Sequence, residues 1–293
     1  MLTMLNLGSN GRLGNQLFQY AALRSAAISN GLECKIPDQS RMHWHGQNSL
    51  LNNFNIKSNT ITEEDIKVLK HQVNEPANTT PGTYYKILEK LPNNCNINGF
   101  FQNEKYFIKN KNIIIKELQV INSNNYLSSL YKYSGDYKVV SIHIRMGDVT
   151  DGTNPSYNSY HGTGPLDSNS IVGRYNLKAI DMLQDKNTIF FIFGGGSRTG
   201  DDTNDINFLT RYFNSNKNLF YNDPIVIQSN DPINDFVIIQ NCYSNITSFA
   251  STFSWWASYL NLNANKIIAP QNFYYDENLI PQEGFFPSNW NLI

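Results

Sequence analysis

The chain has 293 residues and carries 23 Lys and Arg against 24 Asp and Glu, which gives a formal net charge of -1. This balance excludes the broadly basic surface that binds nucleic acid or anionic lipid without specificity, so nucleic acid is not an expected partner. The length exceeds that of a typical domain. It predicts either one large domain or two α/β halves, which we divide into residues 1–135 and 136–293.

The cysteines and the apolar runs bear on where the protein works. Cys34, Cys95 and Cys242 are odd in number and lack a Cys-x-x-Cys pairing, which indicates neither a disulfide framework nor a zinc site. The opening segment has no basic leader, and no later apolar run approaches the ~18 residues that cross a bilayer. These patterns predict a cytoplasmic protein without an integral membrane segment and leave peripheral attachment to a membrane open.

The first elements along the chain are a short apolar strand that ends near Leu7, a glycine-rich loop and a helix over about 15–30. Apolar residues recur within this helix at three- and four-residue spacing, and Gly31 marks its end. The following stretch, about 38–92, is polar, rich in Asn and weakly periodic. No order of elements is predicted for it.

Strands and helices alternate in the second half. Compact apolar runs bounded by turn residues predict buried strands, and periodic segments between them predict helices. This alternation is typical of a parallel, doubly wound sheet, where ligands bind beyond the carboxyl ends of the strands. The predicted strands cover 138–145, 187–193, 244–249 and 266–269, and the predicted helices cover 175–183 and 235–242.

The loop before the first helix contains Arg12, Gly14, Asn15 and Gln16. Glycines at a strand-to-helix turn let backbone N–H groups approach a ligand, and the start of a helix favours negative charge. A sugar diphosphate would suit such a loop. The alternative is that the glycines only punctuate the chain, because the segment has neither a dinucleotide fingerprint nor the Lys-Ser/Thr of a phosphate-binding loop.

The strand over 138–145 is polar on one face, since alternation places His143 and Arg145 on the same side as Ser141. Burying such groups is unfavourable unless they are paired, so a polar face lines a site or belongs to an ion-pair network. Arg145 suits a diphosphate because its guanidinium donates two hydrogen bonds at once. Asp148 follows the strand and is, with His143, a candidate base.

Two further segments follow strands and could bind a nucleotide. Gly194 and Gly195 end the strand over 187–193, where a glycine turn allows close approach of a base or ribose, or forms a flexible turn. Ser251, Thr252 and Phe253 open a helix, where hydroxyl and N–H groups cap the helix and hold a phosphate. The tryptophans that come next, at 255 and 256, are expected in the core.

No metal or other cofactor is predicted. His43 and His45 could in principle bind a metal, but no third ligand lies near them in the sequence. The sequence also lacks an Asp-x-Asp pair, through which many sugar transferases hold a divalent ion. The charge of a phosphate would then be met by Arg145, backbone N–H groups and hydroxyls.

Four ordered segments give the chain a resemblance to the α-1,2-fucosyltransferases of glycosyltransferase family 11. The resemblance spans nearly the whole sequence. The segments are GRLGNQLFQYA at 11–21, GFFQNEKYF at 99–107, HIRMGD at 143–148 and STFSWWASYLN at 251–261.

The resemblance implies a GT-B-like fold, with two Rossmann-type domains that face a cleft and a donor site in the C-terminal half. It also implies inverting, metal-independent transfer of L-fucose from GDP-fucose to a galactose-containing glycan, with an α-1,2 linkage. Arg145 would bind the pyrophosphate and Asn15 would lie by the sugar. Ser251 and Thr252 would hold phosphate oxygens, and Asp235 would meet the guanine.

Departures from the family pattern keep alternatives open. Met146 stands where the family has a second Arg, Ala250 where it has Asn, and Gly194 to Gly196 where it has Ser-Asp-Asp. Another GDP-6-deoxyhexose donor such as GDP-rhamnose, or an inactive protein that binds a glycan or nucleotide sugar, therefore stays possible. A nucleotide-dependent oxidoreductase is disfavoured because no Gly-x-Gly-x-x-Gly turn follows the first strand. The acceptor and the oligomeric state are not predicted.

Overall fold

The computed structural model describes residues 1–77, 82–146, 160–196, 201–276 and 278–293. These residues form two compact units. The first contains Met1–Ile121 and Ile280–Ser288, and the second contains Asn122–Leu279 and Asn289–Ile293. Within the described residues, no helix has both the length and the apolar character needed to cross a bilayer.

A parallel sheet in the order β5-β2-β1-β7-β6 forms the centre of the first unit. Its middle strand pairs on both sides, because Leu2 lies opposite both Cys34 and Cys95. The strand after Met1 is shorter than predicted, since turns begin soon after Thr3. The strands are β1 (Leu2–Thr3), β2 (Cys34–Ile36), β5 (Asn59–Thr60), β6 (His71–Asn74) and β7 (Cys95–Asn98).

The first predicted helix is confirmed as α1 (Leu13–Ser29), which is buried along most of its length. It ends where Asn30 bonds back to the carbonyl of Ala26 and Gly31 adopts a φ of +64°. One polar side chain of α1 is paired inside the unit, since Arg24 forms an ion pair with Glu117 at 2.9 Å. Glu117 ends α3 (Lys111–Glu117).

The polar stretch at about 38–92 folds into short elements. Asp or Thr side chains cap two of them. Asp38 caps η1 (Gln39–Arg41), and Thr62 forms a capping box with Asp65 at the start of α2 (Glu63–Lys67). Short elements carry little periodicity, which explains why the sequence gives no order for them. They also include β3 (His43–Trp44), β4 (Gln47–Asn48), η2 (Leu51–Asn53) and η3 (Lys86–Leu88), and η4 (Glu104–Tyr106) and η5 (Ile108–Asn110) follow later in this unit.

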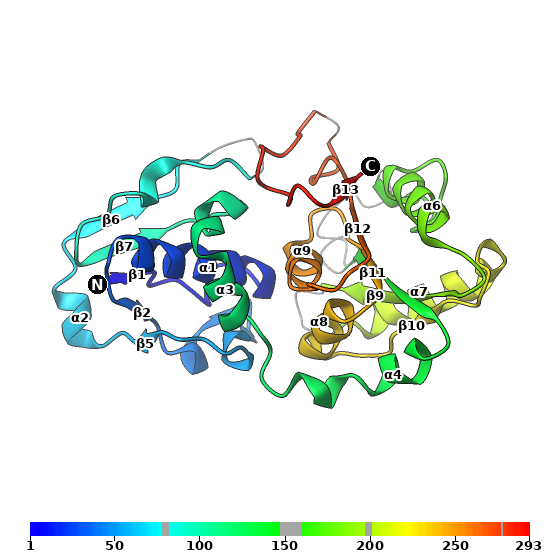
Figure 1. The fold of residues 1–293 in the computed structure, drawn as a ribbon, viewed down its shortest axis with the longest axis horizontal. Coiled ribbons are helices and arrows are strands. Elements are labelled where there is room, and N and C mark those ends of the chain that lie inside the picture. The colour runs from blue at the N-terminus through cyan, green and yellow to red at the C-terminus, as the bar shows by residue number, and fades with distance from the viewer. Residues whose placement is uncertain (78–81, 147–159, 197–200, 277) are drawn as a thin grey trace. The chain divides into compact units, whose positions relative to one another are not determined.

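The second unit is built on the parallel sheet that the alternating pattern predicts, in the order β10-β9-β8-β11-β12-β13 (Figure 1). The ranges predicted for β8 and β12 agree with the structure, whereas β11 is shorter than predicted. The strands are β8 (Lys138–Arg145), β9 (Thr188–Gly195), β10 (Ile225–Val226), β11 (Ser244–Ile246), β12 (Lys266–Ala269) and β13 (Asn291–Leu292).

Helices cover both faces of this sheet. Ile142 and Ile144 of β8 face an apolar cluster with α6 and α7, and the polar face of β8 lies toward α8 and α9. In the ribbon, α8 and α9 lie on one side of the sheet and α6 and α7 on the other (Figure 1). Two helices start earlier than predicted, because Ser170 and Asp231 cap them. The helical segments are η6 (Ser123–Tyr126), α4 (Ser128–Ser134), α6 (Ile171–Leu183), α7 (Thr203–Ser215), η8 (Lys217–Leu219), α8 (Pro232–Gln240) and α9 (Thr252–Tyr259).

The division between the units differs in two places from the one drawn at residue 135. Residues 122–135 belong to the second unit, because η6 contacts α8 and α4 contacts β8. Residues 280–288 return to the first unit, where Gly284 accepts a hydrogen bond from the Glu104 N–H at 2.9 Å. The roles expected for the two halves stay predictions.

Replacing Gly173 with Ala should lower the free energy of unfolding by about 1–3 kcal/mol, because an added β-carbon would overlap the backbone of Asp167. Gly135→Ala is the matched control, since nothing lies within 4 Å of the place that its added methyl group would take, and its φ of -74° suits alanine. Urea unfolding followed by tryptophan fluorescence compares the variants. Equal midpoints for Gly173→Ala and the wild type would contradict the packing described for α6.

Candidate functional site

Arg145, the last residue of β8, is tied to the loop that follows β11. Its backbone N–H donates to the Ser248 Oγ at 2.9 Å, and its guanidinium Nη1 donates to the Ala250 carbonyl. The side chain is half-buried. Both contacts fix the cation at the carboxyl end of the sheet, where the parallel topology predicts a ligand site.

Serine hydroxyls connect this loop to the start of α9. The Ser248 N–H donates to the Ser254 Oγ at 3.1 Å, and the Ser254 N–H donates to the Ser251 Oγ at 3.2 Å. Ser251 therefore caps α9, as its position before the helix predicts. The first-turn N–H groups and hydroxyls lie at the positive end of the helix dipole, an arrangement that favours an anion.

Ala250 adopts a left-handed backbone conformation, with φ at +48°. This region is unfavourable for an L-residue with a β-carbon and suits Gly or Asn. The same conformation aims the Ala250 carbonyl at Arg145. The strained residue is thus part of the contact that holds the arginine.

His143 lies on the polar face of β8 and is buried, with its ring 5.5 Å from that of Phe253. Burial and the nearby positive charge of Arg145 lower the pKa of His143 to about 3. An imidazole with such a pKa takes up a proton poorly at neutral pH. This pKa and the contact with Phe253 favour a packing role, and the role of His143 as a base stays a prediction.

Asp235 lies in the first turn of α8. Its side chain keeps some exposure, but desolvation of the carboxyl group raises the pKa of Asp235 to about 8, and the charges of Asp202 and Asp231 act in the same direction. Asn234 and Ser229 offset part of this effect by hydrogen bonding. The neighbouring Phe236 packs edge-on against Phe253, with ring centroids 5.5 Å apart, which links α8 to the start of α9.

Packing explains the glycines at the end of β9. A β-carbon at Gly194 would overlap the side chain of Leu209 from α7, and Gly195 has a φ of +152° with Asp202 against it. The Gly196 N–H donates to Asp202 at 2.9 Å. Asp202 thus stands beside the glycine turn, close to Asp235. A ligand role for Gly194 and Gly195 stays a prediction.

The glycine-rich loop of the first unit is braced from inside. Gln16 is buried, its amide donates to the Gly11 carbonyl at 2.9 Å, and its oxygen accepts from Ser49. Gln16 therefore shapes the loop, and its side chain is occupied within the protein. Gly14 is buried in the first turn of α1, and Arg12 precedes that turn as its N-cap residue.

Asn15 brings two of the matched sequence segments together. Its side-chain oxygen accepts a hydrogen bond from Gln102 at 2.9 Å, and its side chain lies against Gly11, where a β-carbon would overlap it. Both Asn15 and Gln102 are half-buried, so part of each residue is open to solvent. Gln102 was missed by the sequence reasoning, although it lies within the second matched segment.

The structure thus groups the predicted residues by unit. Arg145, His143, Ser251 and Phe253 lie together in the second unit through the contacts above, and Thr252 begins α9 beside them. Ser248 and Ser254 also belong to this candidate site. The sequence reasoning missed them, because an isolated serine gives no signal of its role. Asp148 lies outside the described residues.

The His43-Trp44-His45 segment contains β3, a short strand of the first unit. In the part of the chain that the structure describes, no three His, Cys, Asp or Glu side chains gather in a way that could hold a metal ion.

Asp235→Asn should stabilise the protein increasingly as the pH rises from 5 to 8.5. A carboxyl whose folded pKa is raised gives its full stability below the unfolded pKa near 3.8 and loses it as the pH rises through about 8. At pH 8.5 we expect a gain of about 1 kcal/mol or more, which is roughly 2–4 °C in Tm. Differential scanning calorimetry at each pH measures the difference. Asp181→Asn, on an exposed part of α6, is the control; a flat difference for Asp235→Asn would contradict the raised pKa.

Ala250→Gly and Ala250→Asn should each raise the free energy of unfolding by about 1 kcal/mol, because both residues accept a positive φ. Ala264→Gly provides the matched control: its backbone is not left-handed, so the same change should lower stability by about 0.5–1 kcal/mol. Chemical denaturation compares the variants. A loss of stability in both Ala250 variants would show that the strain is absent.

The chain is similar to known proteins in sequence and in fold. The sequence pattern of the family described as Glycosyl transferase family 11 matches residues 2–293. The chain is 27% identical to the O-antigen biosynthesis glycosyltransferase WbnK of Escherichia coli, over 92% of this chain and 94% of that one. It is 25% identical to an alpha-1,2-colitosyltransferase of the same organism, over 92% of both.

Among solved structures, the fucosyltransferase NodZ from Bradyrhizobium has a similar fold, with a TM-score of 0.52, 12% identity and coverage of 91% of this chain and 94% of that one. A structure of NodZ soaked with GDP-fucose aligns with a TM-score of 0.51. At this identity the likeness concerns the fold, which is GT-B-like in both. With the family pattern matched along nearly its whole length, the chain belongs to glycosyl transferase family 11.

Proposed function

We propose that this protein transfers L-fucose from GDP-fucose to a galactose-containing glycan and forms an α-1,2 linkage with inversion at the anomeric carbon. The observation that carries the proposal is the anchored Arg145 beside the hydroxyl-rich start of α9. Its guanidinium can bridge two oxygens of a diphosphate, and the helix start can hold the rest of its charge. The family and the fucosyltransferase fold of its structural neighbour support the donor class.

In the proposed reaction, an acceptor hydroxyl oxygen attacks the anomeric carbon on the face opposite GDP. The bond from that carbon to the diphosphate oxygen breaks, GDP leaves with the electron pair, and the hydroxyl proton passes to a base. Arg145 would stabilise the charge that grows on the leaving group without a metal ion. Asp148 or His143 would accept this proton, and the low pKa of His143 favours Asp148.

Asp235 would meet the guanine. A carboxylate can accept hydrogen bonds from the N1–H and the amino group of guanine, and ionised Asp235 would gain partners that offset its desolvation. Asn15, which belongs to the first unit, would contact the transferred sugar. We place the reaction in the cytoplasm, which the three free, buried cysteines support.

A colitosyl donor is the second candidate, because a relative of similar coverage is named an alpha-1,2-colitosyltransferase. Fucose and colitose are both 6-deoxy sugars, so the phosphate and guanine contacts proposed here would serve either donor. GDP-rhamnose is a third donor with the same diphosphate chemistry. Donor preference therefore has to be measured.

The purified protein should release GDP from GDP-fucose in EDTA when a galactose-terminated acceptor is present. Arg145→Ala should lower the rate by about 10²–10³-fold, because a main stabiliser of the leaving group is lost. The rate of Arg145→Lys should be intermediate, since an ammonium keeps the positive charge but cannot donate the two parallel hydrogen bonds of a guanidinium. Arg211→Ala, on an exposed part of α7, is the matched control and should be unchanged.

Melting curves of the variants separate a lost fold from a lost reaction. Near-normal release by a folded Arg145→Ala would overturn the leaving-group role. Loss of release in EDTA that added Mg²⁺ restores would overturn metal independence. Release from the colitosyl or rhamnosyl donor but not from GDP-fucose would keep the reaction and change the sugar.

A further inference from the structure

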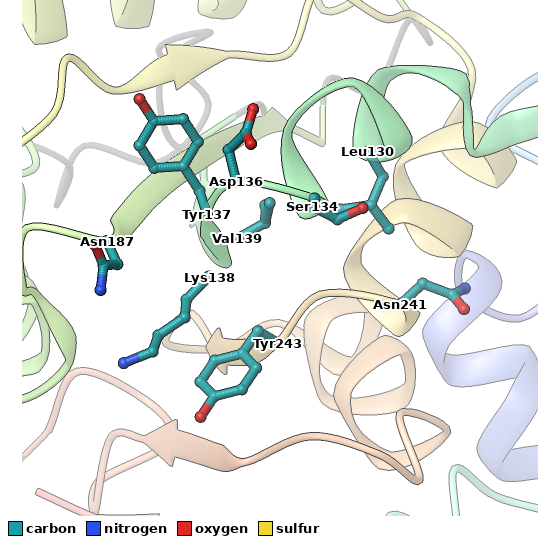
Figure 2. Close-up of a pocket in the computed structure, with 10 residues that line it drawn as sticks. Leu130, Ser134, Asp136, Tyr137, Lys138, Val139, Asn187, Asn241 and Tyr243 are labelled. Atoms are coloured by element: carbon teal, nitrogen blue, oxygen red, sulfur yellow. The ribbon is translucent and has the colours of Figure 1, made fainter.

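A cavity of about 580 Å³ opens in the second unit at the amino-terminal ends of the strands (Figure 2). Lys138 begins β8, Asn187 precedes β9 and Tyr243 precedes β11, so three neighbouring strands place their starts around it. Its volume falls within the roughly 300–1,000 Å³ typical of small-molecule sites. The lining includes Asp136, Tyr137, Lys138, Asn187, Asn241 and Tyr243.

This cavity is separate from the site at Arg145. Lys138 and Arg145 are the first and last residues of β8, which at ~3.3 Å per residue places them about 23 Å apart. Parallel α/β sheets bind their ligands at the carboxyl ends of the strands. The cavity lies at the amino-terminal ends, which form the opposite edge of the sheet. A ligand here would be bound independently of the diphosphate.

The charges argue against a phosphate or another anion in this cavity. Lys138 is the one cation among the described residues that line it, and its ammonium is paired with Asp185 at 2.8 Å. Asp136 adds a carboxylate without a basic partner in the lining. An anionic ligand would therefore be repelled, whereas a neutral ligand rich in hydroxyl groups would find acceptors and donors.

The remaining walls combine tyrosine rings with amides. Tyr243 is 43% exposed, and in Figure 2 the rings of Tyr137 and Tyr243 lie on opposite sides of Lys138. The side chains of Tyr137 and Asn187 make no hydrogen bonds to other described residues. Aromatic faces cover the C–H faces of a sugar ring, while amide, carboxylate and hydroxyl groups satisfy its hydroxyls.

We propose that this cavity is a second glycan-binding site, which holds a neutral segment of two or three hexoses. The proposal rests on the proposed function for the choice of probe and for the expected effect on acceptors. A glycan bound here would be held by the protein away from the reacting end. The site would therefore raise the affinity for long acceptors through effective concentration and leave short acceptors unaffected.

A galactose-terminated tetrasaccharide with a diazirine at its reducing end tests the proposal by photo-crosslinking and peptide mapping. Label should appear within residues 130–139 or 241–243, unlabelled tetrasaccharide should compete for it, and GDP should not. Tyr243→Ala and Asn187→Ala should each reduce this label at least fivefold. Tyr221→Ala, an exposed tyrosine of the same unit that does not line the cavity, should leave it unchanged.

Label confined to other peptides, or equal labelling of the wild type and both cavity variants, would overturn the second site. Melting curves confirm that the variants are folded. GDP release with a monosaccharide acceptor is measured in parallel and separates this proposal from the proposed function. Cavity label without GDP release would support the second site and count against the transferase. GDP release without cavity label would support the transferase and overturn the second site.

Discussion

The contact between the end of β8 and the loop after β11 is the interaction on which the site depends. Arg145 is held at its backbone by Ser248 and at its guanidinium by the carbonyl of Ala250. Because β8 and β11 are adjacent parallel strands, their carboxyl ends open onto the same edge of the sheet. The cap of α9 continues from this loop, so one short segment fixes both the cation and the helix start.

A buried polar network supports that edge from below. The Asn245 amide donates to the Ser141 Oγ at 2.7 Å, and the Asn245 oxygen accepts from Asn261 at 2.8 Å. All three side chains are buried, where unpaired polar groups would be strongly unfavourable. Satisfied networks of this kind fix one arrangement of the core. On the polar face of β8, Ser141 therefore belongs to the buried network, whereas Arg145 belongs to the candidate site.

Sequence patterns predicted the strands and helices whose formation depends on neighbouring residues. The ranges of β8 and β12 follow from compact apolar runs, and α1 follows from its spacing and Gly31. The caps at Ser170 and Asp231 extended two helices beyond their apolar stretches. Contacts distant in sequence could not be predicted, such as Ser248 with Arg145 and Gln102 with Asn15. Motif resemblance supplied the family, and the roles of the site residues await experiment.

The path of the C-terminus bears on how the protein is made. Residues 280–288 pack in the first unit, where the buried Phe285 lies against Gly82, and β13 then completes the second sheet. The chain leaves the ribosome with its N-terminus first, so residues 1–121 emerge long before Phe285 does. The first unit therefore lacks Phe285 until residues 122–279 have also been made. Both units are completed only after residues 280–293 have been made, and neither unit corresponds to one continuous stretch of the sequence.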